Sequence, residues 1–129
     1  MNPTYFDVMT LLEANSFGVD GVSLFGGEWG SPSQQILVME GVGFPSPLTG
    51  LYEQPGVQIL VRGEKGEADI DVYLRAKPIS DFMLAQPEDL DINGTCYKGF
   101  EEGSNLAPLG KDSNERFTYS QNFYTWRNR

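Results

Sequence analysis

The closing segment of the chain, residues 116–126, constrains the fold more than any other stretch. Its sequence, RFTYSQNFYTW, places Phe117 and Phe123 at odd positions and Tyr124 and Trp126 at even positions. Successive side chains of a β-strand point to opposite faces, so this alternation predicts a strand with large side chains on both faces. One face can enter a core. The other then displays Tyr124 and Trp126, either for cross-strand packing or for a protein partner.

Three further strands are predicted upstream. VQILVRG (57–63) and a run over 95–101 have the composition of β-strands. QILVMEG (35–41) is apolar without alternation, which predicts a strand buried on both faces or lying at an interface. Glycine and proline interrupt the intervening stretches, so ordered loops are expected over 16–34 and 42–56.

Two helices complete the predicted fold. Residues 4–14 have the spacing of a short amphipathic helix, and residues 67–86 carry apolar side chains at intervals of three and four. Pro78 lacks the amide hydrogen of the helix ladder, so it is expected to kink or split the second helix near Lys77. The order of elements predicts one α+β domain over 1–129, with two main helices packed on one face of a four-stranded, mostly antiparallel sheet and long glycine- and proline-rich loops.

Composition limits the classes of function. The formal net charge is −9, which disfavours nonspecific attraction to nucleic acid phosphates. No apolar run is long enough to span a bilayer, so no membrane association is expected. The N-terminus lacks the pattern of a signal peptide, and the lone Cys96 cannot form an internal disulfide. These features predict a soluble protein made in the cytoplasm.

No constellation of residues promises catalysis. Histidine is absent, which removes the commonest general base and the usual zinc ligand. The dense carboxylates are interpreted as solvated surface; they are Asp69, Asp71, Glu88, Asp89 and Asp91. Residues 89–95 resemble the start of a calcium loop but lack its full ligand series, and Asn93-Gly94 is better explained as a turn. We therefore expect no enzymatic activity, no metal and no cofactor.

Charge is distributed unevenly along the chain. Residues 64–91 hold eight acidic and three basic residues, whereas residues 111–129 hold four basic and two acidic ones. One end of a molecule could attract the other end of its neighbour, and such head-to-tail contacts close into a ring when the rotation permits. The alternative is an acidic helix and an arginine-bearing tail that both face solvent.

Three sequence motifs together resemble a known family. They are YEQPGVQILVRG (52–63), ING-x-x-Y-x-G (92–99) and PLGKDSNERF-x-YS-x-NF (108–123), with an acidic amphipathic helix between the first two. In this order they resemble the small tail terminator and minor capsid proteins of long-tailed bacteriophages. The matching positions are Pro55, Val57, Val61, Arg62, Gly63, Gly110, Asp112, Arg116, Asn122 and Phe123. Family members often have Asp-Glu-x-Gly-Arg at the last turn, whereas residues 112–116 of this chain lack that glycine.

The resemblance implies a virion structural protein of the tail and neck. Six copies would form a ring on the end of the completed tail tube, stop tail elongation and present a surface for head-tail joining. The implied partners are other copies of the chain, the tail tube protein and a head connector or completion protein. DNA would pass through the ring without specific binding, and assembly would take place in the host cytoplasm. The alternative is another neck protein, either a head completion protein or a connector adaptor.

Exposed aromatic and arginine side chains are the candidates for these contacts. The candidate interface residues are Trp29, Phe44, Tyr52, Arg62, Arg116, Tyr124, Trp126, Arg127 and Arg129. Arg62 and Arg116 could instead pair with acidic residues of their own chain. Loops 16–34 and 42–56 are further candidates, because rigid sheets commonly carry recognition on their loops.

Overall fold

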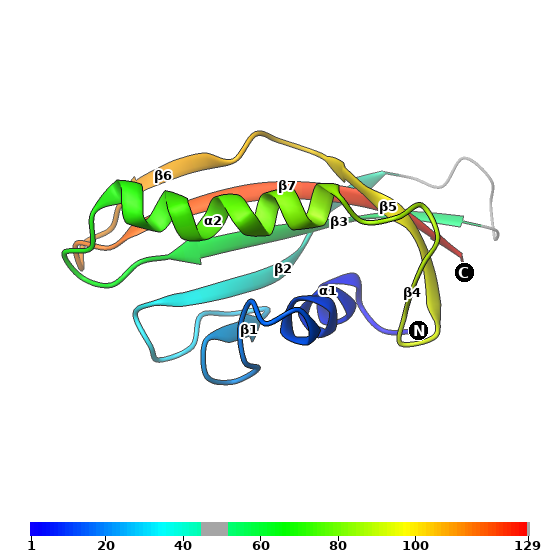
Figure 1. Cartoon of the computed structure of the whole chain (residues 1–129), viewed down its shortest axis with the longest axis horizontal. Coiled ribbons are helices and arrows are strands. Elements are labelled where there is room, and N and C mark those ends of the chain that lie inside the picture. The colour runs from blue at the N-terminus through cyan, green and yellow to red at the C-terminus, as the bar shows by residue number, and fades with distance from the viewer. Residues whose placement is uncertain (45–51, 129) are drawn as a thin grey trace.

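A computed structural model describes residues 1–44 and 52–128 of the chain. The fold is built on one curled sheet, with the strands in the order β1-β2-β3-β7-β5-β4 and with β6 also paired to β7 (Figure 1). The strands are β1 (Leu24–Gly26), β2 (Gln35–Phe44), β3 (Tyr52–Arg62), β4 (Leu90–Ile92), β5 (Thr95–Glu102), β6 (Ala107–Lys111) and β7 (Phe117–Asn128). The long strands β2, β3 and β7 are adjacent and antiparallel, so they form the rigid centre of the molecule.

The sheet is larger than the four strands expected from the sequence. The described residues form seven strands, and β1 runs parallel to β2, so the sheet is mixed. The three additional strands, β1, β4 and β6, have three to five residues each. Segments this short show no recognisable period, and β6 contains Pro108 and Gly110, which favour a loop locally. Pairing with a preformed neighbour, rather than local preference, makes them strands.

Both predicted helices form, and the second is unbroken. Helix α1 covers Thr4–Ala14 and α2 covers Asp69–Leu84. The expected split near Lys77 does not occur, because α2 continues through Pro78 as one helix. Pro78 is exposed, so the carbonyl group that its missing amide leaves unpaired lies on the solvent side, where water can hydrate it.

The two helices cover the same face of the sheet, here called the inner face. Alternate positions of the central strands point to this face, for example Val38, Ile59 and Phe123, and each is at most 3% exposed. They form one core with the buried stripes of both helices, Val8, Met9 and Leu12 from α1 and Val72, Ala76, Ile79 and Met83 from α2. The prediction of one α+β domain with its helices on one face is therefore confirmed.

A buried polar network joins the two ends of the chain beneath α1. Asp7 is fully buried and accepts hydrogen bonds from the Tyr97 hydroxyl and from Nδ2 of Asn93 at 2.9 Å. Arg127 of β7 donates to the Asn2 carbonyl at 2.8 Å and pairs with Glu53 at 2.7 Å. Burial, followed by the hydrogen bond to Asp7, raises the pKa of Tyr97, so its hydroxyl stays a donor. The network fixes α1 against β5 and β7.

Two turns show how the local sequence sets the connections. Asn93 and Gly94 take φ values of 51° and 82° and join β4 to β5, which confirms the predicted turn. In the last turn, Glu115 takes a φ of 58° where the resembled family often has glycine. The amides of Asn114 and Arg116 donate to the Asp112 carboxylate at 2.8 and 3.0 Å, which holds the turn without a glycine.

The loop expected over 42–56 is mostly strand. Strand β2 continues to Phe44 and β3 begins at Tyr52, so the two strands extend beyond the helices at one end of the sheet (Figure 1). Residues 45–51 lie outside the described part of the chain. The other expected loop, 16–34, contains β1.

Candidate assembly surface

The face of the sheet opposite the helices, here called the outer face, carries the side chains that the core does not use. Its positions follow from the strand register and are Gln35, Leu37, Met39 and Phe44 of β2; Tyr52, Gln54, Gln58, Leu60 and Arg62 of β3; Thr118, Ser120, Asn122, Tyr124, Trp126 and Asn128 of β7; and Glu101 of β5, opposite Tyr124. Among these described positions, Arg62 and Glu101 are charged. Most of this face is therefore polar and aromatic, a composition typical of protein interfaces.

Four aromatic side chains gather at one end of the outer face. Phe44 and Tyr124 pack edge to face with ring centroids 5.1 Å apart, and Tyr52 and Trp126 do the same at 6.5 Å. Phe44 is 53% exposed and the other three are half-buried. We call these four residues the aromatic patch. Three strands contribute to it, because the extended ends of β2, β3 and β7 lie side by side.

The other end of the outer face is closed by the segment that follows β1. Trp29 lies over the Arg62 guanidinium, whose central carbon is 4.1 Å from the ring centroid. Arg62 also donates to the carbonyls of Ser33 and Pro32 at 2.9 and 3.0 Å. Burial and the nearby Arg116 charge lower the pKa of Arg62, while Asp112 opposes them. Arg62 thus holds the segment against the sheet through backbone carbonyls rather than through an acidic side chain.

Beside this contact lies a hollow of about 260 Å³, here called the outer hollow. Leu60, Thr118, Trp29 and Arg62 line it on the side of the sheet and the segment after β1. Residues 109–112 of β6 and the turn after it line the opposite side. The sequence offered little signal for this site, because β6 was not recognisable as a strand.

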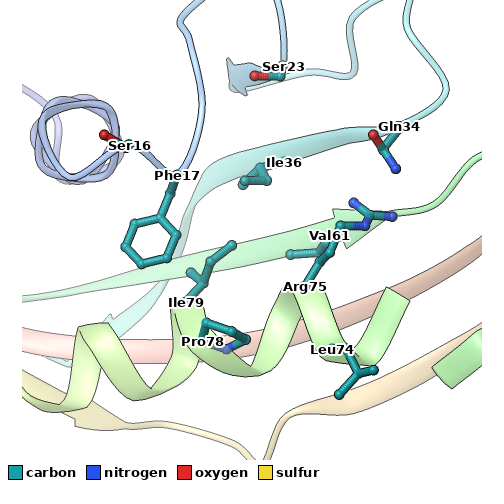
Figure 2. Close-up of a pocket in the computed structure, with 10 residues that line it drawn as sticks. All are labelled: Ser16, Phe17, Ser23, Gln34, Ile36, Val61, Leu74, Arg75, Pro78 and Ile79. Carbon is teal, nitrogen blue, oxygen red and sulfur yellow. The ribbon is translucent and has the colours of Figure 1, made fainter. Parts of the chain in front are cut away.

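A second concavity, of about 390 Å³, lies on the helix side of the molecule (Figure 2). Figure 2 shows Phe17, Ile36, Val61 and Ile79 surrounding it, with Arg75 extending from α2 toward Gln34. Arg75 is already paired with Glu67 at 2.7 Å. None of the eight predicted interface residues that the structure describes lines this concavity.

The predicted interface residues divide into two groups. Six lie on or over the outer face, namely Trp29, Phe44, Tyr52, Arg62, Tyr124 and Trp126. Arg116 pairs with Asp112 at 2.9 Å within its own chain, as one of the two interpretations predicted. Arg127 points to the inner face and pairs with Glu53. Arg129 lies outside the described residues.

Three of the five carboxylates that are dense in the sequence make separate structural contacts. Asp69 accepts the Tyr119 hydroxyl at 3.1 Å, Asp89 pairs with Lys98 at 2.7 Å, and Asp91 accepts the Gly94 amide at 3.0 Å. Within residues 1–44 and 52–128, no group of three or more metal-ligating side chains is placed to hold an ion. Over the same described ranges, neither helix is both long and apolar enough to cross a bilayer.

Comparison with known proteins assigns the chain to a family. The sequence profile of a family described as bacteriophage tail terminator protein matches residues 11–127. Among solved structures, a chain in the virion of a native gene transfer agent particle is similar with a TM-score of 0.66 and 14% identity, covering 95% of this chain and 85% of that one. Another solved chain is similar with a TM-score of 0.56 and 11% identity, covering 98% and 92%. No curated protein sequence matches. The chain belongs to the bacteriophage tail terminator family and is a structural protein of the phage tail, not a member of an enzyme class.

Proposed function

We propose that this protein forms a ring of six copies on the end of the completed tail tube. The ring stops the addition of further tube protein and offers its free side to the head connector or completion protein. Head and tail are joined there, in the host cytoplasm, and the ring stays in the neck of the virion. Family membership supports this proposal, and the outer face is the observation that carries it.

The outer face has the composition of a contact surface. The aromatic patch combines large side chains with the neutral polar side chains of Gln58 and Asn122 on the same face and with one carboxylate, Glu101, opposite Tyr124. Aromatic side chains contribute much of the energy of protein interfaces, and few charges have to be desolvated when such a face is covered. Phe44 is the most exposed member of the patch, so it has the most to gain from a partner.

The net charge supports a passage for DNA. With eighteen acidic and nine basic residues, a ring of this chain is strongly negative. A negative bore repels phosphates instead of binding them, so DNA can move through without being held. Specific DNA binding is therefore not part of the proposal.

Electron microscopy of particles made without this protein tests the function. We expect tails of uncontrolled length that do not join to heads. Normal tails on filled heads would contradict the proposal. Tails of normal length that remain unjoined would favour the alternative, a head completion protein or connector adaptor, as would a purified ring of another size.

A pair of matched variants tests the role of the aromatic patch in the same assay. Phe44→Ser removes an exposed ring from the patch, whereas Phe6→Ser removes a ring of similar exposure, 47%, from α1. We expect only Phe44→Ser to reproduce the long, unjoined tails, with the thermal unfolding of both purified variants close to that of the wild type. If both variants gave the same tail lengths and the same degree of head joining, the aromatic patch would not be part of the assembly contact.

A further inference from the structure

We infer that the outer hollow of one copy receives the turn Val19–Val22 of the next copy around the ring. The inference rests on the proposed ring and adds which two surfaces meet in it. The turn offers a carboxylate between two exposed apolar side chains, and the hollow offers cations beside an apolar floor.

The hollow contains a cation that forms no direct ion pair with a carboxylate of the described residues. Arg62 is 6% exposed, yet it contacts Trp29 and two carbonyl groups, and no carboxylate of the described residues lies within ion-pair distance of it. Burying a cation without a counter-charge is unfavourable, and an incoming carboxylate compensates it. The hollow is therefore suited to an anionic group.

Lys111 is a second cationic residue that lines the hollow. Its ammonium lies 5.6 Å from the ring of Phe117, its register partner at an inner-face position of β7. Asp112 also lines the hollow, but its carboxylate already accepts bonds from Arg116 at 2.9 Å and from two backbone amides. Two cationic residues thus line the hollow with one carboxylate that is already engaged, in a protein with a formal charge of −9.

The hollow also has apolar surface to cover. Leu60 forms part of its floor, while Leu109 is 61% exposed and Trp29 is 37% exposed at its rim. A purely ionic occupant such as a phosphate would leave these side chains in water. An apolar turn that carries a carboxylate would bury these apolar side chains and, at the same time, place its carboxylate beside the cations.

The turn Val19–Val22 has this composition. Val19 and Val22 are 54% and 62% exposed, and Asp20 between them forms no ion pair with the described residues. The turn is rigid, because the amides of Val22 and Ser23 both donate to the Val19 carbonyl, at 3.0 and 2.9 Å. A preformed turn loses little conformational entropy when it docks.

The turn lies at the β1 edge of the sheet, whereas the hollow extends over β3 and β7 to β6 on the outer face. The turn directly precedes β1, which is one edge of the sheet, whereas β6 lies beyond β7 on the other side (Figure 1). Two different surfaces that meet between neighbouring copies make a head-to-tail contact, and repetition of such a contact closes a ring when the rotation permits.

Light scattering and zero-length cross-linking of the purified full chain test the inference. Wild-type protein should have the mass of a ring, and a carbodiimide should join Lys111 of one copy to Asp20 of another, as identified by mass spectrometry. Lys111→Glu and Asp20→Lys should each weaken association about tenfold or more, because each places like charges together. The double variant, with the charges exchanged, should restore the ring. Lys65→Glu, an exposed cation outside the outer hollow, is the matched control and should change little.

The outcomes separate this inference from the proposed function. A wild-type ring without the Lys111–Asp20 link, and without rescue by the double variant, would overturn the inference and leave the ring in place. Wild-type protein that stays monomeric at high concentration and in tail-containing mixtures would overturn both. Retention of short duplex DNA by the wild type, lost in Lys111→Glu, would assign the hollow to phosphate and overturn the acidic turn as its occupant.

Discussion

The two faces of the sheet differ in where their side chains find partners. On the inner face, Val57 and Ile59 of β3 are at most 3% exposed, because the two helices of the same chain cover them. On the outer face, Tyr52 of the same strand and Trp126 of β7 pack edge to face against each other and are half-buried. The inner face is completed by folding. The outer face keeps large side chains available, which is the property that assembly requires.

Part of the outer face is also buried within the chain. Arg62, Leu37 and Leu60 lie on this face and are at most 8% exposed, and the segment after β1 folds over Arg62. One end of the outer face is therefore covered by the chain itself, whereas at the end with the aromatic patch Phe44 is 53% exposed. The contrast between the faces predicts a graded series of effects on stability.

Removal of an inner-face ring has the largest expected effect. Phe123→Ala leaves a cavity beneath the helices, since Phe123 is 2% exposed, and should lower the free energy of unfolding by about 3–5 kcal/mol. Denaturant unfolding followed by circular dichroism measures this loss. If Phe123→Ala lowered the free energy of unfolding by less than the outer-face variants do, the inner face would not be the more important one for stability.

Arg62→Met has an intermediate expected effect. Methionine can keep a contact with Trp29 but donates no hydrogen bond to the carbonyls of Ser33 and Pro32, so we expect a loss of about 2 kcal/mol. Arg75→Met is the matched control, because its ion pair with Glu67 is partly exposed. Hydrogen exchange should locate the destabilisation in the segment after β1. Uniform exchange changes across the sheet would argue against a local clamp.

Trp126→Ala has the smallest expected effect on stability. The ring is half-buried and makes one edge-to-face contact, so its loss should cost about 1 kcal/mol in the same denaturant assay. Phe123→Ala, three residues away on the opposite face, provides the comparison within one strand. If the two variants were equally destabilised, the outer face would be part of the core and not a surface held open for assembly.

The local sequence was sufficient to predict an element where its hydrophobic period extended over many residues. The alternation after Arg116 predicted β7 and separated Phe123 from Trp126, and the spacing over 67–86 predicted α2. The apolar run at 35–41 indicated burial on both faces, and Leu37 on the outer face is indeed 2% exposed. Six of the nine interface residues expected from side-chain type alone lie on one surface.

Other features could not be predicted from the local sequence, because they depend on contacts between residues that are distant in the chain. The charge pattern suggested that Arg116 and Arg127 were available to a neighbour, but Asp112 and Glu53 of the same chain pair with them. Glu53 and Arg127 are 74 residues apart, and only the register of β3 against β7 brings them together. The buried network of Asp7 and Tyr97 has the same origin.

The sequence by itself determined the α+β class, the helices, the long strands and the family, because each depends on patterns within a continuous segment or on motifs in a fixed order. Only the tertiary structure decided that short segments such as β6 become strands and that Arg62 has no acidic partner among the described residues. The physical reason is that hydrogen bonding between strands, burial and ion pairing depend on which distant residues meet in space, and local spacing does not encode that.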